Sequence, residues 1–232
     1  RVTVQNLDFQ LRAGEVVGLA GLDGSGQELL MRACVGLLKP QGGQIIIKGT
    51  PCEGLPYRAF LAQNVGFSAA GRLEEGLVSG LTLMEHFALT DPTQGGWIDW
   101  ERARRLTEER IRHYNIYGRP DSPVETLSGG NQQRVLMALM PDHPCLLVLE
   151  HPTRGLDVES ARWIWEQLLA RRQQGTAILF TSADLEEIVT YSDRILVFYA
   201  GQVTEVPDSR TTTVDELGHL IGGHRLERET HA

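Results

Sequence analysis

The 232-residue sequence lacks any apolar run close to the ~20 residues that a membrane-spanning helix needs, so a membrane link is expected to come through a partner. It also lacks an excess of positive charge. The 22 Lys and Arg face 30 Asp and Glu, and the resulting net charge of −8 disfavours a general nucleic-acid surface. The three cysteines, Cys34, Cys52 and Cys145, lack the paired spacing of a metal site. We interpret them as buried thiols of a protein from a reducing compartment.

Apolar runs bounded by glycine or polar turns predict buried strands, at residues 16–20, 45–47, 145–149, 177–180 and 195–199. Helical spacing of apolar residues lies between them, at 28–37, 160–174 and 184–190. Strands that alternate with helices predict an α/β fold with a mostly parallel sheet. Residues 1–4 also have the pattern of a strand, and there is no starting methionine. We therefore expect a fragment whose N-terminal strand is truncated.

Residues 71–142 differ from the rest of the chain. They contain few strand signals and a charged amphipathic helix near 99–114. This stretch predicts a helical lobe, inserted into an α/β core made of 1–70 and 143–224. The charged residues 225–232 are expected to form a tail.

A glycine-rich loop, GLDGSGQE, occupies residues 21–28 between a predicted strand and a predicted helix. A phosphate-cradling loop follows G-x-x-x-x-G-K-[ST], where glycines let backbone N–H groups approach a phosphate at a helix N-terminus. Gln27 stands where the lysine belongs, and Glu28 stands where the Mg²⁺-binding hydroxyl belongs. Taken alone, the loop fits either a phosphate site or an ordinary glycine turn. The candidate nucleotide-binding residues are Gly21, Gly24, Ser25, Gly26, Gln27 and Glu28.

A second loop, LSGGNQQ at residues 127–133, carries the strongest signal in the sequence. Ser128 followed by Gly129 and Gly130 begins a predicted helix, which makes another phosphate-facing helix start. Ser128 can offer a hydroxyl and Gly130 a bare N–H. The alternative is a serine-capped surface helix, which explains the tripeptide but not the surrounding pattern.

These motifs, in this order, resemble the ATPase domains of ABC transporters over nearly the whole chain. CLLVLEHPTRGLD at 145–157 resembles the Walker B strand and the D-loop that follows it. TSADLEE at 181–187 resembles the switch segment, and YSDRILV at 191–197 is similar to the next strand. The lysine-free loop, GRLEEGLV at 71–78 and the Asn-Gln-Gln signature are similar to the C-terminal ATPase half of sugar- and nucleoside-type importers.

The resemblance implies a P-loop NTPase (RecA-like) core with a parallel sheet, an inserted α-helical subdomain and a small antiparallel β part. It also implies that the ATP-hydrolysing residues of this chain's own site have been replaced. The loop lysine falls at Gln27, the Mg²⁺ hydroxyl at Glu28, the Walker B aspartate at Glu150, the water-polarising glutamate at His151, the switch histidine at Ala183 and the Q-loop residue near Ala70. We therefore expect a degenerate site with no metal ligands and little or no ATPase activity from this domain alone.

In the family, two ATPase domains pair head to tail, and each ATP lies between the glycine loop of one and the signature loop of the other. The resemblance therefore implies that four residues complete a partner's site, namely Ser128, Gly129, Gly130 and Gln132. Mg²⁺ is expected in that partner's site, while residues 21–28 are expected to bind ATP weakly or persistently without turnover. Asp157 of the D-loop is expected to couple the two sites.

The expected partners are a second ABC ATPase domain in the same full-length chain and membrane permease subunits, with no nucleic acid. The chain would then lie at the cytoplasmic face of the membrane, attached through the permease by the lobe around residues 71–87. Three alternatives stay open: a competent ABC ATPase in which His151 serves as the base, a non-transport ABC-fold scaffold, and an ABC ATPase that acts on DNA or the ribosome. The acidic charge gives the last no support.

Overall fold

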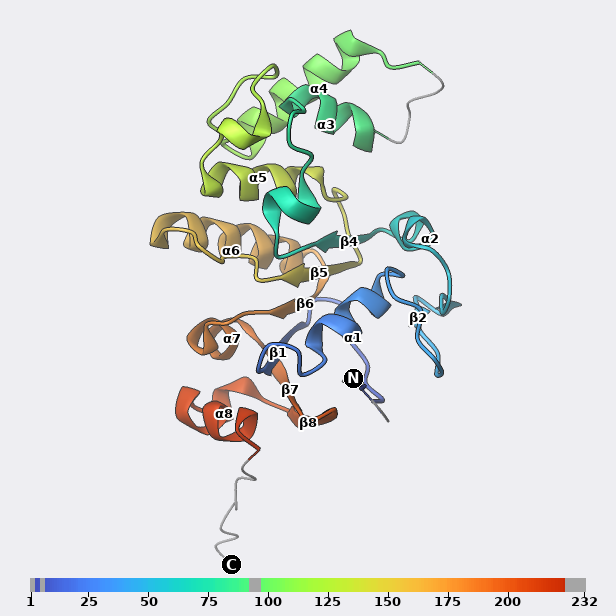
Figure 1. Ribbon diagram of the computed structural model, residues 1–232, viewed down its shortest axis with the longest axis vertical. Coiled ribbons are helices and arrows are strands. Elements are labelled where there is room, and N and C mark those ends of the chain that lie inside the picture. Colours follow the sequence, from blue (N-terminus) through green and yellow to red (C-terminus); the bar gives the residue numbers. More distant parts are fainter. Residues whose placement is uncertain (1–2, 5–6, 92–96, 224–232) are drawn as a thin grey trace, which may run out of the picture. The chain divides into compact units, whose positions relative to one another are not determined.

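A computed structural model describes residues 3–4, 7–91 and 97–223 of the chain (Figure 1). These residues form two compact units. The first comprises the described parts of Arg1–Phe67 and Leu168–Ala232, together with His143–His151. The second comprises Pro152–Gln167 and the described part of Ser68–Asp142. The predicted tail at 225–232 lies outside the described residues.

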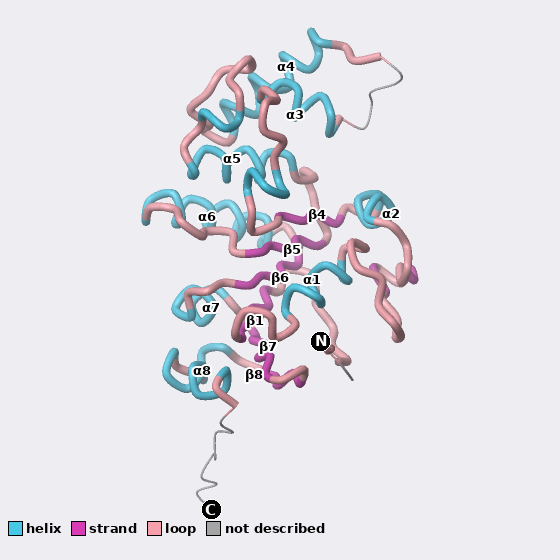
Figure 2. The backbone as a smooth tube through the Cα atoms, in the orientation of Figure 1, coloured by secondary structure: helices cyan, strands magenta, loops and turns pink. Residues whose placement is uncertain are grey.

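A six-stranded sheet has the order β4-β5-β6-β1-β7-β8 (Figure 2). β1 pairs in parallel with β6 and β7, β5 pairs in parallel with β6, and β7 pairs antiparallel with β8. The α/β fold with a mostly parallel sheet is therefore confirmed. The strands are β1 Val16–Gly21, β4 Val65–Ser68, β5 Leu146–Glu150, β6 Ala177–Thr181, β7 Arg194–Tyr199 and β8 Gln202–Val206.

The inner strands are apolar because both faces of the sheet are covered. Val17 and Leu19 of β1 are completely buried, and burying one such side chain contributes roughly 1.5–3 kcal/mol. Helix α1 (Gln27–Cys34) contacts β1 and β5, whereas α7 (Leu185–Tyr191) and α8 (Val214–Ile221) contact β1. In Figure 1, α7 and α8 lie on one side of these strands and α1 on the other.

Parallel pairing places the carboxyl ends of β1, β5 and β6 at one edge of the sheet. Leu19 lies opposite Thr181, and Glu150 also lies opposite Thr181. Ligands of open α/β sheets bind at this kind of edge. The glycine loop, the segment after Glu150 and the segment after Thr181 therefore start from the same place.

A separate two-stranded antiparallel hairpin joins β2 (Ile46–Ile47) to β3 (Thr50–Pro51). The predicted strand at 45–47 is present at Ile46–Ile47, and Ile47 is buried. The prediction of burial is wrong for Ile46, which is 57% exposed because β2 pairs with the equally short β3 outside the main sheet. Helix α2 (Tyr57–Ala62) follows the hairpin. The cysteines are free thiols as expected: Cys52 is buried, while Cys34 and Cys145 pack partly buried against the same core.

The second unit is helical, and its helices begin at recognisable caps. Thr82 and Glu85 form a reciprocal capping box at the start of α3, and the Asp99 carboxylate accepts from the Arg102 N–H at the start of α4. Both α4 and α5 lie where the sequence predicts helices. The elements are η1 Arg72–Gly76, α3 Leu83–Thr90, α4 Trp100–His113, η2 Val124–Thr126, α5 Gly129–Leu139 and the first part of α6 Val158–Gln173.

Several elements were absent from the sequence prediction: β4, β8, α2, α3 and α8. Two of these helices carried a local signal, the Thr-x-x-Glu capping boxes at Thr82 and Thr213. The predicted strand at the N-terminus is wrong for Thr3 and Val4, which are outside any strand, and Arg1 and Val2 lie outside the described residues. Across the described part of the chain, every helix is too short or too polar to cross a membrane.

Candidate functional site

The glycine loop joins β1 to α1 at the carboxyl edge of the sheet. Gly24 has a φ of 78° and Gly26 a φ of 121°, a left-handed backbone that favours glycine. Gly26 is the N-cap of α1 and contributes no side chain, so the first backbone N–H groups of the helix are not covered by a capping group. The loop therefore has the shape and helix position of an anion-binding turn.

The side chain of Gln27 folds back into this loop. It is 7% exposed, and its Nε2 donates to the Leu22 carbonyl over 3.4 Å. A Cβ on Gly21 would lie only 2.4 Å from the same nitrogen, so the amide fills the concave side of the loop. The Gln27 side chain thus lies within the loop and has a neutral amide at the position where the sequence predicts a missing lysine.

Arg32, one turn after Glu28 on α1, pairs with the carboxylates of Glu28 and Glu150. Its Nε lies 3.0 Å from Glu28 Oε1 and 3.4 Å from Glu150 Oε1. The Glu150 side chain is 5% exposed, and a buried carboxylate needs a partner of opposite charge. Sequence reasoning missed Arg32. The i,i+4 spacing from Glu28 was visible, but the contact with Glu150 depends on how α1 packs against β5.

A divalent cation does not fit these side chains as they are arranged. Glu28 and Glu150, the two carboxylates at the predicted Mg²⁺-ligand positions, face the same guanidinium nitrogen of Arg32. Mg²⁺ needs oxygen ligands at close range, and a fixed cation beside them opposes its binding. Within the described ranges, no group of three His, Cys, Asp or Glu side chains could hold a metal ion.

His151 directly follows β5 in a tight turn. Its φ is 47°, which is uncommon for a residue other than glycine, and its backbone N–H donates to the Thr181 carbonyl over 2.9 Å. Thr181 in turn donates its hydroxyl to the Leu19 carbonyl over 3.0 Å. These bonds tie together the carboxyl ends of three strands. Ala183, two residues beyond Thr181, is exposed and brings only a methyl group to the switch position.

The signature loop starts α5 in the second unit. Ser128 is the N-cap, and its Oγ accepts from the Asn131 N–H over 3.4 Å and from the Asn131 amide over 2.9 Å. Asn131 Oδ1 also accepts from the Tyr117 N–H over 2.8 Å. Ser128, Gly129 and Gly130 therefore form a preorganised helix start with backbone N–H groups at its end.

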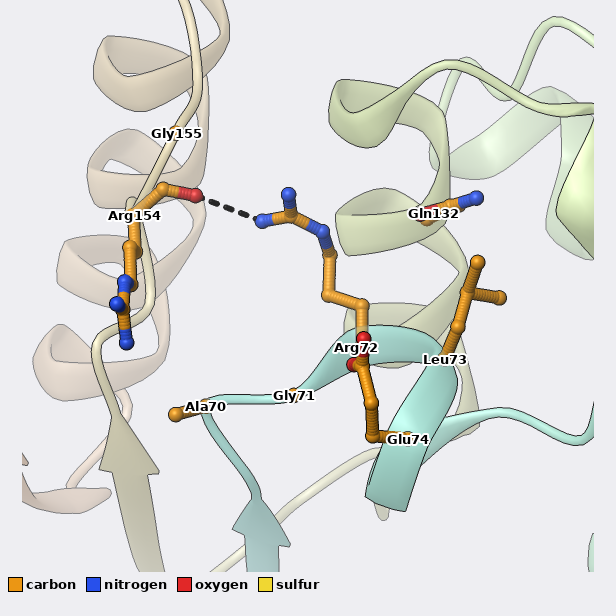
Figure 3. A pocket seen from close by; sticks show the side chains of 8 residues that line it. All are labelled: Ala70, Gly71, Arg72, Leu73, Glu74, Gln132, Arg154 and Gly155. Atoms are coloured by element: carbon orange, nitrogen blue, oxygen red, sulfur yellow. Dashed lines mark hydrogen bonds between the residues drawn. The ribbon is translucent and has the colours of Figure 1, made fainter.

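Gln132, placed by the sequence among the groups offered to a partner, has a different local role. It is 7% exposed, and its amide donates to the carbonyls of Val124 (3.3 Å) and Leu127 (3.2 Å). In Figure 3 its side chain extends away from Arg72. The amide therefore holds the segment that leads into the signature loop.

A pocket of about 520 Å³ opens beside the signature helix, inside the second unit (Figure 3). Arg72 crosses it and donates from Nη1 to the Arg154 carbonyl over 2.7 Å. A Cβ on Gly129 would lie 3.2 Å from Arg72 Nη2, so this guanidinium also contacts the signature loop. Sequence reasoning missed Arg72. The pocket is lined by Ala70, Gly71, Arg72, Leu73, Glu74, Gln132, Arg154 and Gly155.

Asp157 fixes the start of α6. Its carboxylate accepts from the Ser160 N–H over 2.9 Å and from the Ser160 hydroxyl over 2.8 Å. The same hydroxyl would lie 2.7 Å from a Cβ on Gly130, so Ser160 packs directly on the signature helix. Asp157 and Gly130 are thus connected through one serine.

These hydrogen bonds should lower the pKa of Asp157, because they stabilise its ionised form. The Ser160 N–H and then its hydroxyl lower the pKa of Asp157 below its ordinary value. Because the pKa of Asp157 is lower in the folded than in the unfolded state, its ionised carboxylate stabilises the folded protein above the unfolded-state pKa. This stabilisation is lost as the pH falls through the folded-state pKa. NMR titration of Ser160→Ala should show the Asp157 pKa rising part of the way back. Asp208, whose pKa is lowered by Arg210, is the internal control and should not change.

Comparison with known proteins extends the local evidence. The profile of the family described as "ABC transporter" matches residues 4–154. The chain is 36% identical over 230 residues to the nucleoside import ATP-binding protein NupA of Lactococcus lactis. This alignment covers 96% of the chain and 46% of NupA. The chain is 34% identical over 226 residues to the ribose import ATP-binding protein RbsA of Bacillus licheniformis, covering 95% and 46%. The chain thus spans about half the length of these curated relatives.

Solved structures show the same fold. An ATP-binding subunit of an ABC transporter superposes with a TM-score of 0.76 at 24% identity, covering 95% of this chain and 93% of that one. A dimeric ATP-binding cassette in a post-hydrolysis state, bound to ADP and Pi, gives a TM-score of 0.75 at 22% identity, covering 90% and 91%. The glycine loop, the edge after β5 and the signature helix therefore belong to a known architecture.

Proposed function

This chain belongs to the family of ABC transporter ATP-binding domains, and from that premise we propose that it is the non-hydrolysing ATPase half of a nucleoside- or sugar-type importer. In this role it presents its signature loop to the ATP held by a partner domain. The names of its relatives, a nucleoside import and a ribose import protein, support this choice of transporter class. The proposal assigns turnover to the partner's site.

One contrast supports the proposal. The signature loop keeps the serine and the glycines that can contact a phosphate, whereas side chains of this chain occupy its own predicted hydrolytic site. Ser128 caps a helix whose first residues are glycines, as a phosphate-facing loop requires. In the other unit, Gln27 fills the glycine loop and Arg32 holds the two carboxylates at the metal-ligand positions. ATP hydrolysis needs positive charge around the γ-phosphate and a positioned water, and these substitutions remove the groups that supply both.

The remaining parts of the proposal follow from the family. ABC ATPase domains bind ATP with Mg²⁺, and importers of this family work with membrane permeases and paired ATPase domains. We place the second ATPase domain in the same full-length protein, because this chain spans 46% of the length of NupA. Attachment to a permease through the second unit would hold the chain at the cytoplasmic face of the membrane. ATP at residues 21–28 would stay bound without turnover.

The direct test is ATP turnover by the assembled transporter when a bulky cation replaces Ser128. Loss of turnover supports the proposal, since Ser128 lies in the loop that the partner's ATP would meet. Normal turnover contradicts it, because a signature loop that serves no ATP can accept the substitution.

Arg72 provides a second prediction for the assembled transporter. Arg72→Met removes the hydrogen bond to the Arg154 carbonyl and the contact with Gly129, so the signature loop and the D-loop lose their shared anchor. We expect turnover to fall by about tenfold or less, since hydrogen bonds from charged groups contribute about 1.5–3 kcal/mol and exposure reduces that value. Arg154→Met is the matched control, because it keeps the accepting backbone carbonyl and should retain normal turnover. Equal losses in both variants would contradict the anchoring role.

A further inference from the structure

Arg32 places a cation beside Glu28, the residue that ends the glycine loop. Its side chain is 29% exposed, so it is partly buried. It comes from α1, the helix whose N-terminus forms the end of the glycine loop. The charged group therefore lies one turn beyond the place where phosphates meet this type of helix.

The two acidic partners of Arg32 differ in their freedom. The Glu150 side chain, at the carboxyl end of β5, is 5% exposed, whereas that of Glu28 is 63% exposed at the surface of α1. An exposed ion pair is weak, so Glu28 can leave the guanidinium at little cost. The pair with Glu150 stays, because a buried carboxylate without a counterion is strongly unfavourable. An incoming phosphate oxygen can then take the place of the Glu28 carboxylate beside the guanidinium.

Charge balance decides what this arrangement favours. Glu28 and Glu150 alone would set two negative charges near a triphosphate, and a divalent cation would be needed between them. Arg32 removes one of these charges and supplies a planar set of N–H donors that matches phosphate oxygens. Its position beside both carboxylates also opposes the binding of a metal ion there.

We propose that Arg32 takes the place of the divalent cation in this domain, so that ATP binds at the glycine loop without Mg²⁺. The proposal rests on the proposed function in one respect, that nucleotide reaches this loop and is retained. It adds a binding residue, Arg32, and a property, independence from divalent cations, that the family's usual ATP site does not have.

The test measures ATP binding to the chain by equilibrium dialysis, once with excess EDTA and once with Mg²⁺. Wild-type affinity should agree between the two conditions to within about twofold. Arg32→Gln should bind ATP roughly tenfold more weakly in EDTA, because a charge-assisted contact is lost, and Mg²⁺ should restore part of the affinity. The control is Arg58→Gln, which removes an exposed arginine from α2 of the same unit and should behave as wild type.

A second variant guards against misfolding, since Arg32→Gln leaves Glu150 buried without this ion pair. The double substitution Arg32→Gln with Glu150→Gln removes both charges and keeps similar volumes. It should unfold at a temperature close to wild type and should still show the roughly tenfold loss of ATP affinity in EDTA.

Two results would overturn the proposal: wild-type ATP binding that requires Mg²⁺, or no ATP binding in either condition. Wild-type affinity in EDTA for the double variant would also overturn it, because Arg32 would then play no part in binding. None of these results affects the supply of the signature loop, which is measured on the assembled transporter through Ser128. Failure of this proposal and failure of the proposed function are therefore distinguishable.

Discussion

Replacing Ser128 by arginine is expected to lower ATP turnover by the assembled transporter on the order of a hundredfold, the usual loss when one preorganised donor at a transition state is removed. Ser128 begins the loop, and its Oγ is already oriented by the Asn131 N–H and the Asn131 amide. An arginine there removes this cap and places a long cationic side chain where the partner's ATP would pack. The measurement is ATPase activity of the full complex in proteoliposomes.

Ser128→Arg has two effects, loss of the helix cap and obstruction of the signature loop, and a second variant distinguishes them. Ser128→Ala removes the cap without adding bulk, which costs about 1 kcal/mol of stability at a typical helix start. Thermal unfolding should show a similar loss of stability in Ser128→Ala and Ser128→Arg. Turnover should fall much further in Ser128→Arg. If both variants keep wild-type turnover, the loop does not face a nucleotide and the supply of a signature loop to a partner is wrong.

The isolated chain is expected to show no Mg²⁺-dependent ATP turnover above a protein-free background. Loss of a single transition-state donor lowers kcat by about 10²–10³, and under the proposed function the lysine, the catalytic glutamate and the switch histidine are all replaced in this chain. Gln27 is neutral and engaged with the Leu22 carbonyl, and Ala183 has no polar group. Release of inorganic phosphate, followed over hours at saturating ATP, is the measurement.

His151 is the residue that could make this prediction fail. An imidazole can serve as a base near neutral pH, so the assay should cover about pH 6 to 8. His151→Ala is the matched variant, because it removes the imidazole and keeps the chain otherwise unchanged. Clear turnover in the wild type that disappears in His151→Ala would establish a rewired active site in place of a degenerate one. We expect the two proteins to be equally inactive.

The two expected results correspond to an asymmetric pair of composite sites. In one site, the partner's glycine loop would face the signature helix that starts at Ser128, and ATP would be hydrolysed there. In the other, the glycine loop at residues 21–28 would hold nucleotide persistently. Such a division costs the transporter one hydrolysis site, but a retained nucleotide can keep the two domains associated. We infer this division because Gln27 and Arg32 occupy the glycine-loop site of the first unit, whereas Ser128 caps an open signature helix in the second unit.

Much of the fold was predictable because its signals are local. The apolar runs of β1, β5, β6 and β7 and the helical spacing of α4 and α6 appear as periodic patterns within single elements. Short strands were not predicted from the sequence. β4 and β8 have four and five residues, and β8 shows little burial that would produce a clear pattern. Helices α3 and α8 were missed even though each begins with a Thr-x-x-Glu capping box.

The family motifs and their order could be recognised from the sequence alone, because a glycine loop or a capped helix start is made by consecutive residues. The sequence also predicts which charged groups the hydrolytic positions lack, above all the lysine at the position of Gln27. Two contacts are visible only in the folded chain: Arg32 faces Glu150, and Arg72 binds the carbonyl of Arg154, which lies 82 residues later. Such contacts depend on how strands and helices pack, and the spacing of residues along the chain carries no record of them.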